Sequence, residues 1–315
     1  MYEAHFDLRE KPFAMTPDPR FLFLSRTHEE ALAHLRYGLE QRVGFIAITG
    51  EVGTGKTTLL RTLFNDLDDQ RFRLALVFNP CLTPVGLLQV IVKEFGLRTR
   101  RRTVPALIEE LNGFLLDENR AGRTPVLVID EAQTLAADVL EQVRLLSNLE
   151  TERDKLIQIV LVGQPELDHL LERHELRQLA QRIVVRTSLQ ALDRAETEAY
   201  VESRLRVAGA QRPLFDAAAL AEVYRQTDGF PRLINILCDR ALLAAFAQGL
   251  PHVSRATVRG AAGEIASGKA GLWRRLALQI AGVRPVLDGV GVYWVLGGIV
   301  VVEVLLLIWF LQTNI

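Results

Sequence analysis

The hydrophobic and polar positions of residues 25–190 alternate between short apolar runs and longer amphipathic stretches. The apolar runs predict β-strands at 43–49, 73–79, 125–129, 156–162 and 183–187. The stretches between them repeat apolar residues three and four positions apart, which predicts α-helices at 56–67, 84–95, 104–120, 134–149 and 165–180. Strands that alternate with helices form parallel sheets covered on both faces. The pattern therefore predicts an α/β domain of three layers around a five-stranded parallel sheet.

The segments on either side of this domain have different patterns. Residues 1–24 are rich in proline and aromatic residues, and we expect proline to exclude regular helix there. Ser25 is placed to cap a helix that runs to about Glu40, with Glu29 close to the capping-box position. Residues 191–266 contain only helical patterns, at 193–207, 216–226, 231–247 and 254–266. They predict a small all-helical domain.

A long apolar run at 290–311 predicts a transmembrane helix. Its one charged residue is Glu303, which costs about 2.5–3.5 kcal/mol if Glu resembles Asp, less than the many Leu, Ile, Val and Phe residues return at about 0.3–0.6 each. A buried core helix is the alternative, but the run has no polar stripe. The basic residues of the linker 267–289 are Lys269, Arg274, Arg275 and Arg284, so the positive-inside rule places the preceding domains in the cytoplasm.

The composition adds little chemistry of its own. The 315 residues have a net charge of −1, which gives no global sign of nucleic-acid binding. The two cysteines, Cys81 and Cys238, are far apart and have no metal-ligand spacing. They argue against a disulfide scaffold and indicate a reducing compartment.

A phosphate-binding loop follows the first predicted strand and opens the next helix. Its residues match G-x-x-x-x-G-K-[ST] without a mismatch: Gly50, Glu51, Val52, Gly53, Thr54, Gly55, Lys56 and Thr57, followed by Thr58. The glycines let successive N–H groups turn inward toward phosphate oxygens, and the helix N-terminus adds its positive end. We expect Lys56 to reach the β- and γ-phosphates of ATP and Thr57 to place its hydroxyl on Mg²⁺.

Two further strands end in polar residues beside this loop. Asp130 and Glu131 follow the apolar run 126–129. We expect Asp130 to hold Mg²⁺ and Glu131 to orient and deprotonate a water aimed at the γ-phosphate, which favours hydrolysis over transfer. The alternative is a solvated strand end. Gln164 follows the run 160–162 and is a candidate to bond that water or the γ-phosphate, or a turn residue before Pro165.

Arginines supply the remaining candidate site residues. Arg232 follows Gly229-Phe230-Pro231 at a helix start in the helical domain and is either a γ-phosphate contact or a surface residue. Arg182, directly before the last strand, is preferred to Arg177 as a residue that enters a neighbouring subunit's site. Either arginine has a surface ion pair as its alternative. The basic run 98–102 is a solvated loop, a lipid contact or a nucleic-acid contact.

These motifs together resemble the AAA+ ATPases, and most closely the general secretion pathway protein A type with its exopolysaccharide, exosortase and pilus relatives. The resemblance covers about residues 1–265. It is carried by Met1-Tyr2-Glu3 with Phe6 and Leu8, Pro12-Phe13, residues 16–21 (TPDPRF), 49–58 (TGEVGTGKTT), 130–133 (DEAQ), 163–167 (GQPEL), 176–183 and 229–235. It implies a sheet order of 5-1-4-3-2, a Pro-rich start near the adenine, and Gln164 and Arg232 as sensors.

The resemblance also implies partners and a location. We expect a homo-oligomer, ring or filament, on the bacterial inner membrane, with its ATPase domain in the cytoplasm and secretion or polysaccharide-export proteins as membrane partners. The secretion protein type has a periplasmic peptidoglycan-binding domain after its span, whereas here only four residues follow the predicted span, so we expect no direct role in remodelling peptidoglycan. A nucleotide-dependent scaffold with slow hydrolysis and a DNA-associated transposition-type ATPase are the alternatives. The anchor and the near-neutral charge argue against nucleic acid.

Overall fold

The computed structural model describes residues 1–15, 18–78, 83–100, 102–151 and 154–268. The chain divides into two compact units, Met1–Ala270 and Gly271–Ile315, and all described residues belong to the first. The linker 267–289, apart from the end of one helix, and the predicted span 290–311 lie outside the described residues, as do Cys81, Arg101 and residues 16–17. Among the described residues, no helix is long and apolar enough to cross a membrane.

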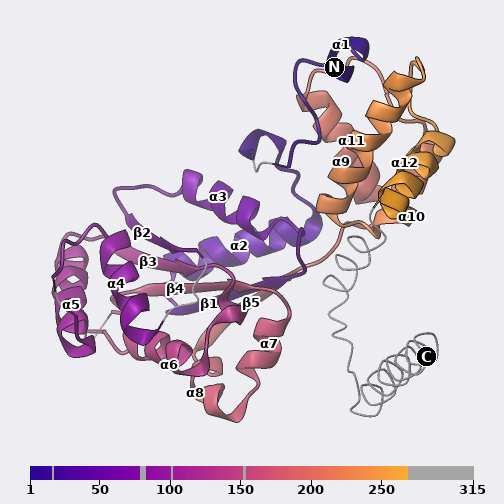
Figure 1. Cartoon of the computed structure of the whole chain (residues 1–315). Helices are drawn as coiled ribbons and strands as arrows, with labels where there is room; N and C mark the ends of the chain where they lie inside the picture. Colours follow the sequence, from indigo (N-terminus) through magenta and orange to yellow (C-terminus); the bar gives the residue numbers. More distant parts are fainter. Residues whose placement is uncertain (16–17, 79–82, 101, 152–153, 269–315) are drawn as a thin grey trace, which may run out of the picture. The chain divides into compact units, whose positions relative to one another are not determined.

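A five-stranded sheet forms the centre of the α/β domain (Figure 1). Its strands are β1 (Phe45–Gly50), β2 (Phe72–Val77), β3 (Thr124–Ile129), β4 (Gln158–Gly163) and β5 (Ile183–Leu189). Their spatial order is β2-β3-β4-β1-β5 and every neighbouring pair is parallel. This confirms the parallel sheet expected from the strand–helix alternation and the order implied by the resemblance.

Helices cover both faces of the sheet because successive strand residues point to opposite sides. Ile46 and Ile48 of β1 pack in a core with α2 (Arg26–Glu40) and α3 (Lys56–Asp66). Phe45 and Ala47 pack in the core of the other face. The helices on that second face are α4 (Pro84–Glu94), α5 (Val104–Arg120), α6 (Ala137–Leu146), α7 (Glu166–Leu171) and α8 (Arg177–Ala180).

Two predicted helices differ from those observed. The helix expected at 134–149 is a 3₁₀ turn, Ala132–Thr134, followed by the shorter α6, because Leu135 and Ala136 have extended backbones. The helix expected at 165–180 is broken into α7, a 3₁₀ turn at His174–Leu176, and α8. Its buried leucines explain the break, since Leu171 and Leu176 are five residues apart and cannot share one helical face.

The helical domain consists of α9 (Arg194–Val207), α10 (Ala217–Thr227), α11 (Pro231–Ala247) and α12 (Arg255–Gly268). The first segment of the chain completes its core, with Tyr2, Phe6, Leu8, Phe13 and Phe21 buried there. Our expectation that proline excludes regular helix from residues 1–24 is wrong at the very start. A short helix, α1 (Tyr2–His5), precedes the first proline, and a 3₁₀ turn forms at Pro19–Phe21.

Candidate functional site

The predicted phosphate-binding loop joins β1 to the first residue of α3. Its backbone turns through left-handed conformations at Gly53 (φ +87°) and Gly55 (φ +100°), which glycine adopts without the clash of a side chain. Left-handed residues placed between right-handed ones turn successive backbone N–H groups to one side, which forms a concave row that binds anions. Because α3 begins at Lys56, the positive end of that helix lies at the same place.

Lys56 lies inside the loop, with only 8% of its surface exposed. Its Nζ donates hydrogen bonds to the carbonyl oxygens of Gly50 (2.5 Å) and Glu51 (3.0 Å). Burial lowers the pKa of the Lys56 ammonium, and the carboxylates of Glu131 and Asp130 oppose that shift. The ammonium is thus a partly desolvated cation, which an anionic ligand would stabilise.

Asp130 and Thr57 are brought together from β3 and α3. The Thr57 hydroxyl donates to Asp130 Oδ2 at 3.3 Å, and the Glu131 N–H donates to Asp130 Oδ1 at 2.9 Å. Burial raises the pKa of the Asp130 carboxyl, so a nearby cation would favour its ionised form. A hydroxyl beside a carboxylate is a donor set that suits Mg²⁺, which binds few protein oxygens and completes its shell with water and phosphate.

A cavity of about 250 Å³ adjoins this pair. It is lined by Thr57, Leu60, Arg61, Phe64, Leu76, Val77, Phe78, Val128 and Asp130. The polar pair therefore lies at one wall of an otherwise largely apolar hollow.

Glu131 and Gln164 also come together, from the ends of two neighbouring strands. Glu131 is exposed and has a left-handed backbone (φ +54°). Its Oε2 accepts hydrogen bonds from the side-chain amides of Gln133 (2.7 Å) and Gln164 (3.3 Å). Gln133 Oε1 in turn accepts from the Gln164 N–H at 3.1 Å. Both of these bonds end on Oε2 of the Glu131 carboxylate, whose side chain is otherwise exposed.

The three arginine candidates have different surroundings. Arg232 is exposed, and its stem packs on the loop so closely that a Cβ atom at Gly53 would lie 2.6 Å from the Arg232 Cβ. Arg182 is half-buried and donates to Ser147 Oγ of its own chain. Arg177, which we ranked below Arg182, is exposed. On accessibility alone, Arg177 is better placed than Arg182 to reach a neighbouring subunit.

Sequence reasoning missed two residues that shape this site. Gln133 links Glu131 to β4, and its only signal was its place in the DEAQ motif. His28, on α2, is buried against the loop, with Nε2 2.9 Å from the Thr54 carbonyl oxygen. Its only signal was its position three residues after the predicted cap Ser25, which does cap α2.

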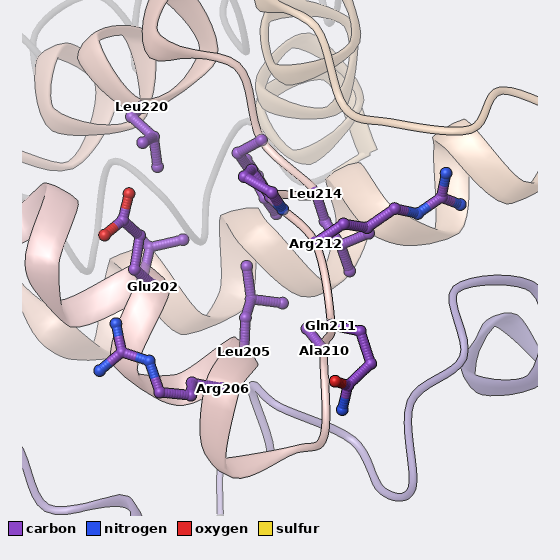
Figure 2. A pocket seen from close by; sticks show the side chains of 11 residues that line it. Glu202, Leu205, Arg206, Ala210, Gln211, Arg212, Leu214 and Leu220 are labelled. Carbon is purple, nitrogen blue, oxygen red and sulfur yellow. The ribbon is translucent and has the colours of Figure 1, made fainter.

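A second cavity, of about 240 Å³, lies within the helical domain (Figure 2). It is lined by Val201, Glu202, Leu205, Arg206, Ala210, Gln211, Arg212, Pro213, Leu214, Phe215 and Leu220. None of these lining residues is a predicted site residue, so this cavity is separate from the loop.

Comparison with known proteins shows which family the chain resembles. Residues 39–171 match a family model described as an AAA domain. General secretion pathway protein A from Aeromonas hydrophila is 44% identical over 292 residues, which are 92% of this chain and 53% of that protein. The chain thus spans about half the length of this curated relative.

Solved structures share the fold at lower sequence identity. The Aeropyrum pernix ORC2 protein, in ADPNP–ADP complexes, has a TM-score of 0.62 and 21% identity, over 81% of this chain and 71% of that one. Drosophila ORC bound to DNA also has a TM-score of 0.62, with 22% identity over 83% and 66% of the two chains. At these identities the likeness supports the fold alone.

Proposed function

We propose that this chain, which belongs to the AAA+ ATPases, is a membrane-anchored ATPase that hydrolyses ATP to assemble or energise an export system of the bacterial envelope. Over most of its length the chain is related to general secretion pathway protein A. The observation that carries the hydrolytic part is the Glu131 carboxylate, fixed by two amides beside the phosphate-binding loop. A site that only bound nucleotide would not need a carboxylate held in this way.

The residues around the loop have separate tasks in this proposal. The N–H groups of the loop and the Lys56 ammonium hold the phosphates, and Thr57 and Asp130 hold Mg²⁺, which neutralises phosphate charge when it is bound. Glu131 orients a water through Oε1 and takes its proton. Gln164, bonded to the same carboxylate, keeps that oxygen directed toward the site. Arg232 contributes positive charge from the helical domain, since its stem already lies against Gly53.

The anchor and the partners extend the proposal beyond the site. The apolar run 290–311 would hold the protein in the bacterial inner membrane as a single span, with its ATPase domain in the cytoplasm. The basic residues of the linker before the span would bind anionic lipid headgroups. The name of the curated relative points to secretion proteins as partners, and polysaccharide-export proteins stay open. We also propose that the protein works as a homo-oligomer. Arg177 and Arg182, which precede β5, are candidates to enter the ATP site of a neighbouring subunit.

Membrane fractionation of two forms tests the anchor. The full chain should sediment with membranes and resist extraction by high salt, whereas residues 1–270 should be released into the soluble fraction. Both forms should hydrolyse ATP, because the loop and its partners lie within residues 25–232. A truncated form that still sedimented would refute the anchor, and a soluble full chain would refute the membrane location.

A further inference from the structure

His28 joins the start of α2 to the phosphate-binding loop through two hydrogen bonds. Its Nδ1 lies 2.6 Å from Ser25 Oγ and its Nε2 lies 2.9 Å from the carbonyl oxygen of Thr54. Both side chains are closed off from solvent, with His28 3% and Ser25 2% exposed. Ser25 Oγ also accepts from the His28 N–H at 3.4 Å, as the cap of α2. The ring is therefore fixed at both nitrogens.

The partners of the ring decide which nitrogen carries the proton. A carbonyl oxygen can only accept, so Nε2 is the protonated nitrogen and donates to Thr54. In the neutral ring, Nδ1 must then accept from the Ser25 hydroxyl. Burial lowers the pKa of the His28 imidazole, which favours this neutral form.

The bond to Thr54 sets the orientation of the next N–H group. Within a planar trans peptide, the carbonyl and the N–H that follows it point in opposite directions. Holding the Thr54 carbonyl toward His28 therefore turns the Gly55 N–H away from α2, to the side of the peptide where a phosphate would bind. Because glycines flank Thr54 and rotate freely, the loop backbone by itself does not enforce this orientation. A reversed peptide would present carbonyl lone pairs to an anion.

The ring is also in direct contact with the loop. A Cβ atom at Gly55 would lie 2.9 Å from His28 Nε2, so only a glycine leaves room for the ring. We propose that His28 is a positioning residue of the phosphate-binding loop, which holds the Thr54–Gly55 peptide with its N–H directed at the phosphates of ATP. This inference rests on the proposed function, that the loop binds ATP.

Two substitutions in the full chain separate this role from a merely structural one. In His28→Gln the side-chain amide reaches the position of Nε2 and can still donate to Thr54. In His28→Asn the amide reaches only the position of Nδ1 and cannot. His34→Asn is the matched control, because His34 is an exposed histidine on the same helix. The dissociation constant for ATP, KM, kcat and the melting temperature are measured for each.

We expect His28→Asn to weaken ATP binding and to raise KM about tenfold, equivalent to ~1.4 kcal/mol. His28→Gln should stay within about threefold of the unaltered chain, and His34→Asn should match it. Equal loss in the Gln and Asn variants, or unchanged ATP binding in His28→Asn, would overturn the positioning role while leaving the proposed function intact. If the unaltered chain bound no ATP, both proposals would fall.

The tautomer gives a test that needs no variant. A long-range ¹H–¹⁵N spectrum of the histidine-labelled full chain should show the buried ring protonated at Nε2 and not at Nδ1 at neutral pH. A neutral ring protonated at Nδ1 alone could not donate to Thr54, and finding it would overturn the inference even if every His28 variant failed to fold.

Discussion

Replacing Glu131 with glutamine should stop hydrolysis without loosening ATP, and the geometry shows why the two effects separate. The amides of Gln133 and Gln164 both donate to Oε2 of Glu131, at 2.7 and 3.3 Å. In Glu131→Gln an oxygen can remain at the Oε2 position and accept both bonds, while the amide nitrogen takes the place of Oε1. The side chain keeps its position and loses only its basicity.

The size of the effect follows from the loss of a general base, which contributes about 10²–10⁴ in rate. We therefore expect kcat to fall by ~10²–10⁴, equivalent to ~2.7–5.4 kcal/mol of activation free energy. The dissociation constant for ATP should stay within about threefold, because the loop, Lys56 and Thr57 are untouched. Phosphate release in a single turnover and binding of a fluorescent ATP analogue measure the two quantities separately.

Glu166→Gln is the matched control for charge. Glu166 is exposed at the start of α7, and its carboxylate is close enough to act on the pKa of both Glu51 and Lys56. Removing this charge should change turnover by less than about threefold. If both variants slowed hydrolysis equally, or if Glu131→Gln turned over as the unaltered chain does, the assignment of Glu131 as the base would be refuted.

Two further predictions concern the subunit contact and the helical domain. Lys56→Ala should abolish ATP binding. Mixing it with Arg177→Ala should restore part of the ATPase activity, because the first variant supplies the arginine and the second supplies an intact ATP site. No recovery in any mixture, including one with Arg182→Ala, would show that neither arginine acts between subunits. Glu222, 1% exposed, accepts hydrogen bonds from Arg225, Arg255 and Arg259, which hold the pKa of its carboxyl well below the usual range. Glu222→Gln should lower the free energy of unfolding in urea by ~1–3 kcal/mol at neutral pH. Since the pKa is lowered on folding, this difference should be present above pH ~4.3 and shrink as the pH falls below it; a difference that grew in acid would contradict the ion-pair network.

The three central strands were predictable because they are buried on both faces and therefore read as short apolar runs. Strands β1, β3 and β4 are buried at every position, and each was expected within two residues of its observed start. Their spatial order could not come from this pattern, since a buried strand looks the same at any place in the sheet. It came instead from the resemblance.

The placement of the candidate site residues was predictable for a related reason, but the residues that contact and hold them were not. Asp130, Glu131 and Gln164 directly follow buried strands, and the carboxyl ends of parallel strands meet at one edge. His28 and Gln133 act through contacts to residues 26 and 31 positions away in the chain. Neither periodicity nor local spacing carries information about such contacts, and a buried histidine on an amphipathic helix looks like any other half-polar position.

The first segment of the chain shows how a local rule and a tertiary contact compete. Proline does prevent long helices in the described part of this segment, yet its aromatic side chains are buried in the core of a domain whose first helix begins at Arg194. Arg204 of α9 fixes this arrangement. It is 8% exposed, donates to the carbonyl oxygen of Pro12 at 2.6 Å, and stacks its guanidinium 4.7 Å from the centre of the Phe21 ring. The chain thus enters the helical domain first and then runs directly into α2, whose first turn carries His28. The helical domain thus contacts the phosphate-binding loop directly through Arg232 against Gly53. Helix α2 contacts the same loop through His28 against Thr54, so a change in the position of α2 would act on the Thr54–Gly55 peptide.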